Sequence, residues 1–548
     1  MGTDNQSSAV LKTVRNYFAE FALLRGCGRE FWVVQIVNLF DCVAYFATMT
    51  VGTLYLSETL GYTDNQAAWV WALCMWVYTG VGFIAGFIGD SFGIRRTLYL
   101  SVLLLLISRT AVWVTDLKLV IIPALFVLSV GAALMTPILI SATKRYTTKE
   151  TQTSGFNLLY FLMNIGAFFG NFFLDALRGS HWGNRSVFML GSGLSIVCWL
   201  CILIFWRKGI ARVDAATQAQ RAEQAEEWEA PWTIAISVFQ ESAFWRFMLF
   251  LVILTGVRQV FEHQYQVYPK YYQRTMSQYV LGVDLAIAGT LDEGILPEAL
   301  TQALAAAGHD VPEGATVRIV EARQRWELQL PEGQGPGPGV YYLRDDDTQI
   351  GVYASDAPIG LLNSINPFII CFGVVISTPI VARFKLFNVM FVGIVFSSAS
   401  MLTLCISPEW FAGVFGLNVY QGYTAIILAQ VVVFSIGEVI WSPRLYEYTA
   451  AIAPPGREAS YMGLSYVPMF FARLAEGPLA GLLLTKYCPP DIGSRLTDVP
   501  YTQGPQMMNL ILAAMALSTP VLIVLFRGVI QKESRLEQQA EPGAGPSA

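Results

Sequence analysis

Twelve apolar runs, each about as long as a membrane-spanning helix, constrain this chain more than any other feature of its sequence. About 30 Å of hydrocarbon takes roughly 20 helical residues to cross, and a backbone inside it must satisfy its hydrogen bonds internally. The runs lie at 31–57, 67–89, 96–114, 119–142, 154–177, 186–206, 244–271, 360–382, 388–406, 423–452, 459–485 and 507–527. We therefore predict an all-α membrane protein with twelve transmembrane helices.

Composition agrees with lipid as the main solvent and excludes several functions. Charged residues are 14% of the chain, whereas an ordinary soluble domain has about 25%. The net charge of −5 shows no basic excess, so we expect no nucleic-acid partner. The eight Cys and three His are scattered, which predicts no metal site. The sequence also lacks a phosphate-binding G-x-x-x-x-G-K-[ST] loop and any nucleophile–base constellation, so we expect no direct ATP coupling, no cofactor and no enzyme.

The order of the runs predicts two six-helix halves. Short loops after the second, fourth and eighth runs carry basic residues such as Arg95, Arg96, Lys144 and Arg383. By the positive-inside rule, both termini lie in the cytoplasm, of a plasma or bacterial inner membrane. The expected segments are a cytoplasmic N-terminal segment (1–30), the first six-helix bundle (31–206), a cytoplasmic linker (207–243), helix seven (244–274), an insertion (275–358), helices eight to twelve (359–527) and a cytoplasmic tail (528–548).

Two of these segments have local patterns of their own. Residues 9–25 have the spacing of an amphipathic helix on the membrane surface, or of an ordinary helical arm. In the insertion, 297–308 predicts a helix, and 316–330 and 339–353 predict two strands. The insertion is thus a small extracytoplasmic α+β domain that binds a protein partner, or an ordered hairpin with no role of its own.

One local motif lies between the second and third runs. The segment 82–98 contains Gly86, Asp90, Gly93, Arg95 and Arg96. Glycine permits close helix approach, and an acid with paired arginines can bridge helices at a cytoplasmic gate. At this position the motif resembles the signature of the major facilitator superfamily. The resemblance implies two six-helix halves that rock about a central site.

Three further stretches resemble the proton-coupled oligopeptide transporter (POT) family. They are Phe156, Tyr160, Asn164 and Gly166 in the fifth run, Asn366 and Pro367 in the eighth, and Gly437, Glu438 and Pro443 in the tenth. The resemblance implies that Glu438 binds the amino group of a peptide. It also implies substrate contacts from Tyr45, Tyr78, Tyr160, Asn164 and Asn366.

The chain departs from the POT family where that family has charges in its first and fourth runs. Asn38, Asp41 and Cys42 stand in place of Glu, Glu and Arg, and Thr136 stands in place of Lys. The resemblance ties those family charges to proton coupling and to binding of the peptide carboxylate. Other residues of this chain must therefore supply both functions, if it has them.

Several ionisable residues lie inside the apolar runs, where a charge is costly and suggests function. Arg258 and Glu262 share one face of the seventh run because they are four apart, and His263 is adjacent. Glu262 or His263 is the protonation site, or Arg258 and Glu262 merely neutralise each other. Arg473 and Glu476, three apart, are expected to pair. Asp41 is expected to pair with Arg258 or with Arg109, and Arg109 itself is expected to be structural.

Aromatic residues and one sequon complete the candidates. The residues that line a pocket, or only pack in the bundle, are Tyr45, Tyr78, Tyr160, Trp441, Tyr446 and Tyr466. Asn184-Arg185-Ser186 fits an N-glycosylation sequon.

The function that fits these features best is secondary active transport. We expect proton-coupled alternating access that moves short peptides or other amine-bearing solutes across the bilayer. One alternative is a facilitator or exporter of a non-peptide solute, which the losses at Cys42 and Thr136 favour. Another is a receptor or scaffold that uses residues 275–358 to hold a partner.

Overall fold

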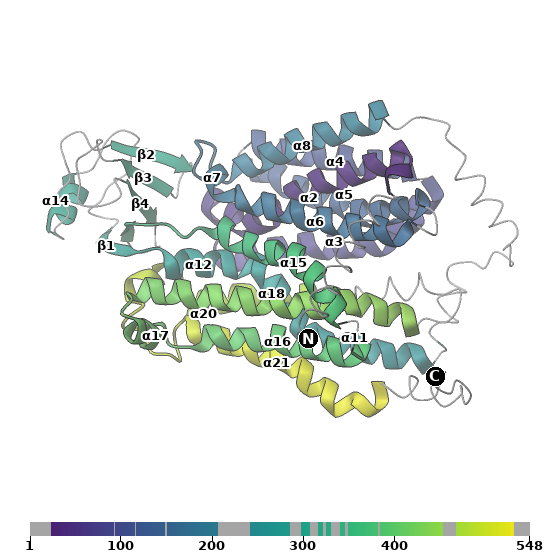
Figure 1. Ribbon diagram of the computed structural model, residues 1–548. Coiled ribbons are helices and arrows are strands. Elements are labelled where there is room, and N and C mark those ends of the chain that lie inside the picture. Colours follow the sequence, from purple (N-terminus) through teal and green to yellow (C-terminus); the bar gives the residue numbers. More distant parts are fainter. Residues whose placement is uncertain are drawn as a thin grey trace, which may run out of the picture.

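The computed structural model of the protein consists of two groups of long helices, with a small sheet at one end (Figure 1). It describes residues 24–92, 94–115, 117–147, 151–205, 240, 242–284, 298–306, 316–321, 325–329, 340–345, 349–381, 384–452 and 467–530. The expected surface helix at 9–25, most of the 207–243 linker and most of the tail therefore lie outside the described residues.

The first half contains six long helices and one short one. They are α2 (Arg29–Leu54), α3 (Asp64–Phe92), α4 (Ile94–Val114), α5 (Lys118–Arg145), α6 (Gln152–Phe172), the short α7 (Leu174–Arg178) and α8 (Arg185–Phe205). A short turn, η1 (Leu24–Gly26), precedes them, and α2 continues into a π-helical turn, η2 (Tyr55–Thr59). Each long helix corresponds to one apolar run of the sequence.

The second half repeats the arrangement with more interruptions. Its helices are α11 (Ser242–Gln266), α12 (Tyr268–Met276), α15 (Ile359–Val381), α16 (Leu386–Ala399), α17 (Pro408–Phe415), α18 (Val419–Ile452), α20 (Val467–Tyr487) and α21 (Pro505–Ile530), with 3-10 turns η3 (Ser400–Cys405) and η4 (Pro490–Arg495). The seventh run, expected as one helix, divides at Val267, and Pro269 lies in the first turn of α12, where proline is tolerated. The short α17 was not predicted.

The outer surface of the bundle has the apolar character of a lipid-facing surface. Ten of the described helical segments are long and apolar enough to cross a membrane, and α3 and α15 complete the twelve. Large apolar side chains are exposed on many of them, among them Ile107, Ile376, Leu482, Val521 and Leu525. Exposure on this scale marks a surface made for lipid. The chain is a multi-pass integral membrane protein, as predicted.

The insertion forms a five-stranded antiparallel sheet in the order β1-β5-β4-β3-β2. The strands are β1 (Tyr279–Asp284), β2 (Thr316–Glu321), β3 (Arg325–Gln329), β4 (Val340–Asp345) and β5 (Gln349–Tyr353), and α14 (Glu298–Ala306) precedes β2. Each segment that was expected to form one strand forms a pair of antiparallel strands instead. Residues 316–330 contain β2 and β3, and residues 339–353 contain β4 and β5. The strand β1 was not predicted. It follows α12 directly and pairs with β5, which leads back to α15.

Candidate functional site

Two ion pairs join α11 to α20 in the middle of the second half. The Arg473 Nε atom donates to both carboxylate oxygens of Glu262, at 3.0 and 3.1 Å. One turn apart on α20, Glu476 Oε1 lies 2.5 Å from His263 Nδ1. All four side chains are buried. We call these contacts the α11–α20 charge pairs.

These pairs correct one expectation from the sequence and exclude one of its alternatives. Arg473 does not pair with Glu476 as expected, and Glu262 does not neutralise Arg258, because it pairs with Arg473. Spacing along one helix suggested both contacts, but the neighbouring helix provides Glu262 and Glu476 with other partners. Because α11 and α20 lie side by side, the partners form across the helix interface.

The His263–Glu476 pair has spare capacity for hydrogen bonding. His263 is 1% exposed and Glu476 is 0% exposed. Among the described residues, neither His263 Nε2 nor Glu476 Oε2 has a hydrogen-bond partner. Buried polar atoms are rarely left unsatisfied, so these two atoms mark the pair as a candidate site for a further hydrogen-bonding partner.

The same region touches the first half through Arg473. Its guanidinium lies over the Tyr78 ring, 4.8 Å from the centroid, and its backbone oxygen accepts a hydrogen bond of 3.0 Å from Trp76 Nε1. Tyr45 lies beside Tyr78, with ring centroids 6.0 Å apart. The candidate aromatics Tyr45 and Tyr78 therefore gather at the boundary between the halves, next to the α11–α20 charge pairs.

A second polar cluster lies between α15 and α18. Asn366 Nδ2 donates to Glu438 Oε2 at 2.9 Å and to Ser435 Oγ at 3.1 Å. A small pocket borders this cluster, and its lining includes Asn366, Gln264 and Gln430. The two residues that the family resemblance placed in the eighth and tenth runs are thus in direct contact.

Arg258 lies against aromatic rings on the α18 side of α11. Its guanidinium lies 4.9 Å from the Phe261 ring centroid and 4.6 Å from that of Trp441. Trp441 in turn donates from Nε1 to Ser397 Oγ at 3.1 Å. A guanidinium is attracted to an aromatic face, more strongly so when desolvated, so the two rings hold Arg258 in place, and no carboxylate of the described residues pairs with it.

In the first half, Asp41 pairs with Arg109, which was one of its two expected partners. Arg109 Nη2 donates to Asp41 Oδ1 at 3.1 Å, and Nη1 donates to Ser195 Oγ at 2.7 Å. A Cβ at Gly191 would lie 2.9 Å from the Arg109 side chain, so this glycine makes room for it. The contacts bring α2, α4 and α8 together.

At Cys42, which stands where the resemblance places an arginine, α2 packs closely against α6. A Cβ on Gly166 of α6 would lie 2.6 Å from the Cys42 Cβ, so the two helices touch there. Nearby, Asn38 Nδ2 donates to the Leu159 backbone oxygen at 2.9 Å.

The remaining candidates are not part of these clusters. Asn164 Nδ2 donates to the Tyr160 oxygen of its own helix at 2.9 Å. Arg95 is half-buried and Arg96 exposed at the start of α4, whereas the burial of Gly86, the side chain of Asp90 and the whole of Gly93 lie outside what the structure describes. The same holds for the Tyr446 side chain and for Tyr466.

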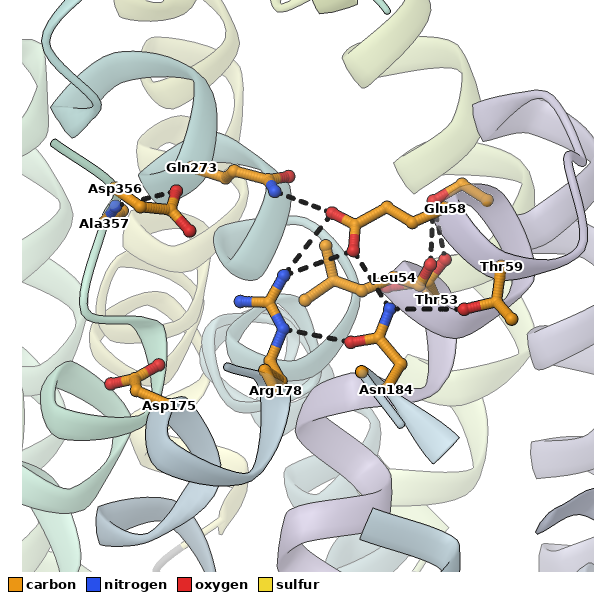
Figure 2. A network of polar contacts seen from close by, with 12 residues as sticks. Thr53, Leu54, Glu58, Thr59, Asp175, Arg178, Asn184, Gln273, Asp356 and Ala357 are labelled. Atoms are coloured by element: carbon orange, nitrogen blue, oxygen red, sulfur yellow. Dashed lines mark hydrogen bonds and ion pairs between the residues drawn. The ribbon is translucent and has the colours of Figure 1, made fainter. Parts of the chain in front are cut away.

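At the end of the bundle that carries the sheet, polar contacts lock the two halves together. Asp64 of α3 accepts from Lys270 at 2.5 Å and from Arg274 at 2.6 Å, both on α12. Glu58 of η2 accepts from Gln273 Nε2 at 2.6 Å (Figure 2). We call these contacts, with those of Asp175 below, the sheet-end lock.

Two first-half side chains complete the sheet-end lock. Arg178 Nη2 donates to Glu58 at 3.2 Å and steadies it from α7. Asp175, also on α7, accepts from the backbone N–H groups of Gly360 and Leu361, at 2.9 and 3.0 Å. A carboxylate is favourable there because those groups begin α15. The halves are therefore closed against each other at this end.

The asparagine of the sequon at 184–186 is buried in the fold and is not exposed to solvent. Asn184 is buried, its Oδ1 accepts from Arg178 Nε at 3.0 Å, and its Nδ2 donates to Glu58 at 3.0 Å (Figure 2). The folded chain therefore does not present Asn184 for glycosylation.

Sequence reasoning missed the sheet-end lock. Asp64 and Glu58 lie just outside the apolar runs, where charges are ordinary. One signal was available, because Arg178 is a basic residue in a loop that the positive-inside rule expects to be poor in them. A basic residue in a loop on the extracytoplasmic side points to a specific acidic partner, and the partner of Arg178 is Glu58.

Replacing Asp64 with asparagine is expected to open the sheet end. The change leaves Lys270 and Arg274 buried without their carboxylate, and uncompensated buried charges strongly destabilise the arrangement that holds them. Cys488 is a natural probe, since it is 0% exposed and its backbone oxygen accepts from Arg274 at 2.6 Å. We expect labelling of Cys488 by a membrane-impermeant maleimide to rise severalfold in a chain that keeps only this cysteine.

The matched control is Asp491→Asn, which removes the partner of Arg495 in a surface pair of 2.7 Å within η4. Surface pairs contribute little, so labelling of Cys488 should not change. Equal labelling in Asp64→Asn and the unaltered chain would show that the sheet-end lock does not hold the halves together.

Comparison with known proteins agrees with this architecture. The sequence profile of the Major Facilitator Superfamily matches residues 34–292. Dipeptide and tripeptide permease B of Photorhabdus luminescens is 26% identical over 200 residues, which are 35% of this chain and 40% of the permease. The chain therefore matches about two fifths of that relative's length.

Solved structures extend the likeness to nearly the whole chain. A POT family transporter in complex with 5-aminolevulinic acid shares 14% identity, with a TM-score of 0.59 over 92% of this chain and 96% of its own. A proton dependent oligopeptide transporter studied for substrate recognition shares 14% identity, with a TM-score of 0.60 over 93% and 99%. At this identity the likeness concerns the fold.

Fold and site together define a polytopic membrane protein of two six-helix halves that meet around buried charges. The chain has the fold of the major facilitator superfamily, and it resembles transporters of the POT family. The fold predicted from the motif at 82–98 and from the three POT-like stretches is confirmed.

Proposed function

We propose that the protein is a secondary active transporter that couples a proton gradient to movement of short peptides or other small amine-bearing solutes. The observation that carries the proposal is the buried His263–Glu476 pair with its two unsatisfied atoms. The printed functions of the relatives, a dipeptide and tripeptide permease and proton dependent oligopeptide transporters, support the same class of cargo.

The α11–α20 charge pairs are the proposed route from proton to movement. A proton added to His263–Glu476 changes the local charge by one unit, directly beside Glu262 and Arg473. Arg473 also touches the first half through Tyr78 and Trp76. The charge state of the pair thereby acts on a contact between the halves. This arrangement replaces the first-run charges that the chain lacks.

In the proposed alternating access, the sheet-end lock is the contact that opens and closes. With both termini in the cytoplasm, as the basic loops indicate, the sheet lies on the opposite side of the membrane. The structure then represents a state closed to the outside. Opening requires release of Asp64, Glu58 and Asp175 from their partners on α12 and α15.

The substrate's amino group is assigned to Glu438. A buried carboxylate with one amide partner, Asn366 at 2.9 Å, retains acceptor capacity for an ammonium, and such charge-assisted hydrogen bonds are the stronger kind. The adjoining pocket and the Tyr45–Tyr78 boundary give the ligand an aromatic and amide surround.

Uptake in proteoliposomes tests the proposal. The full chain is reconstituted, and accumulation of labelled dialanine is measured with an inward proton gradient and without one. One pH unit is worth about 1.4 kcal/mol per proton, or about tenfold accumulation for one proton per substrate. Gradient-dependent accumulation is expected. Equilibration without accumulation would indicate a facilitator, and no uptake at all would contradict transport of peptides.

A further inference from the structure

Arg258 is exceptional among the buried cations of the chain. The buried Arg and Lys side chains in the described residues are Arg109, Arg178, Arg258, Lys270, Arg274 and Arg473. Five of them have a carboxylate within 4.0 Å. Arg258, at 8% exposed, has none among the described residues and rests on two aromatic rings instead. A buried membrane charge without a counter-ion is a functional site by default.

Glu438 is the candidate counter-ion for Arg258. It lies one helical turn from Trp441, the α18 residue that Arg258 contacts. Arg258 stacks on Trp441 of α18, three residues beyond Glu438. Side chains on a helix lean toward its N-terminus, which directs the Trp441 ring toward the Glu438 turn. Arg258 acts electrostatically on Glu438, yet the two are not within ion-pair distance. A ligand that reached both groups would therefore meet a cation at one end and an anion at the other.

We propose that Arg258 binds the substrate's carboxylate, so that the second half alone binds both ends of a compact zwitterion. We call the binding positions at Arg258 and Glu438 the two seats. Glu438 takes the ammonium and Arg258 takes the carboxylate, with the Phe261 and Trp441 rings holding the guanidinium in place. This inference rests on the proposed function and narrows its substrate class. Guanidinium and carboxylate form paired hydrogen bonds of well-defined geometry.

The first half offers no substitute for this seat in the residues that the structure describes. Its buried arginines, Arg109 and Arg178, are engaged by Asp41 and Glu58. Thr136 and Cys42 occupy the positions where POT-like proteins carry a basic residue. Recognition of a carboxylate has therefore moved from the first half to α11.

The proposed geometry limits the length of the ligand. Three residues of helix separate Glu438 from Trp441, a rise of about 4.5 Å. A peptide in extended form spans about 3.3–3.6 Å per residue, so three residues reach roughly 10 Å. The two seats therefore suit an amino acid, a short ω-amino acid or a dipeptide better than a tripeptide.

Calorimetric binding to the purified full chain tests the seat without any proton gradient. The probes are δ-aminovalerate, its methyl ester and trialanine. We expect the acid to bind about tenfold or more tightly than the ester, because the ester lacks the charge that Arg258 meets. We also expect the acid to bind more tightly than trialanine.

Variants assign the preference for the acid to Arg258. In Arg258→Gln the acid and the ester should bind alike, whereas Arg258→Lys should keep part of the preference. Glu438→Gln should weaken both probes about tenfold, because both retain the ammonium. Arg495→Gln, a change at an arginine that is about half exposed (51%) on η4, should leave all affinities unchanged.

Each outcome decides the proposal separately from the proposed function. Equal binding of acid and ester by the unaltered chain, a preference that survives Arg258→Gln, or tighter binding of trialanine would each overturn the seat. If Arg258→Gln does not fold, the acid–ester comparison in the unaltered chain and Arg258→Lys still decide. Binding of the acid without proton-driven uptake in proteoliposomes would leave the seat standing and remove proton coupling.

Discussion

Replacing Glu476 with glutamine is expected to abolish proton-driven accumulation of substrate while preserving exchange of substrate across the membrane. Glutamine keeps the size and one hydrogen bond to His263 but no longer carries a charge that a proton can neutralise. Accumulation should fall from about tenfold per pH unit to equality of the two sides. The measurement is uptake in proteoliposomes under an inward proton gradient, followed by counterflow against trapped unlabelled substrate.

The matched control is Glu409→Gln, which makes the same chemical change on an exposed residue of the short helix α17. It should accumulate substrate normally. His263→Gln should reproduce the Glu476→Gln result, because the proposed coupling proton binds to the His263–Glu476 pair. Accumulation that remains proton-dependent in both variants would exclude the pair as the coupling site, and loss of counterflow as well would indicate a structural defect instead.

Removing Arg109 is expected to destabilise the fold more than any other single change proposed for the first half. Arg109→Leu leaves the Asp41 carboxylate buried and unpaired. Breaking a buried pair from one side costs about 3–5 kcal/mol. We expect a lower midpoint of thermal unfolding in detergent and little protein that survives purification.

A second substitution separates loss of the pair from loss of the arginine itself. Asp41→Asn combined with Arg109→Leu should recover part of the stability, because no uncompensated charge then remains buried. Arg495→Leu, at a solvent-exposed pair, should leave the unfolding midpoint unchanged. A fully stable Arg109→Leu would show that this pair is not structural, and would return Asp41 to the list of coupling candidates.

The twelve spans were predictable because the physics that sets them is local. A run of apolar residues about 20 long has few alternatives to a transmembrane helix, and the structure places a helix over each run. The divided seventh helix was less accessible, although Pro269 marked the place. The motifs that resemble the POT family named Asn366 and Glu438 separately as substrate contacts, and the structure joins the two by a hydrogen bond.

Partner choice among the buried charges was not predictable from spacing. All four residues of the α11–α20 charge pairs were identified as candidates, but Arg473 binds Glu262 and Glu476 binds His263, whereas Arg473 and Glu476 were expected to bind each other. Spacing describes one helix, whereas the partner is decided by which helix packs beside it. The same limit hid Asp64, whose two cationic partners lie more than 200 residues away on α12.

The insertion joins the helical bundle through the strands β1 and β5, which follow α12 and precede α15. β1 leaves α12 and β5 enters α15, and the pair closes in register at Asp284 and Gln349. Opposite residues in such a pair lie about 5 Å apart, so a tight two-residue turn would join them. Residues 285–348 could therefore be removed, with the β1–β5 pair kept as the attachment point. The same junction would hold a reporter or a rigid fiducial domain for imaging, oriented by the membrane bundle through two short strands.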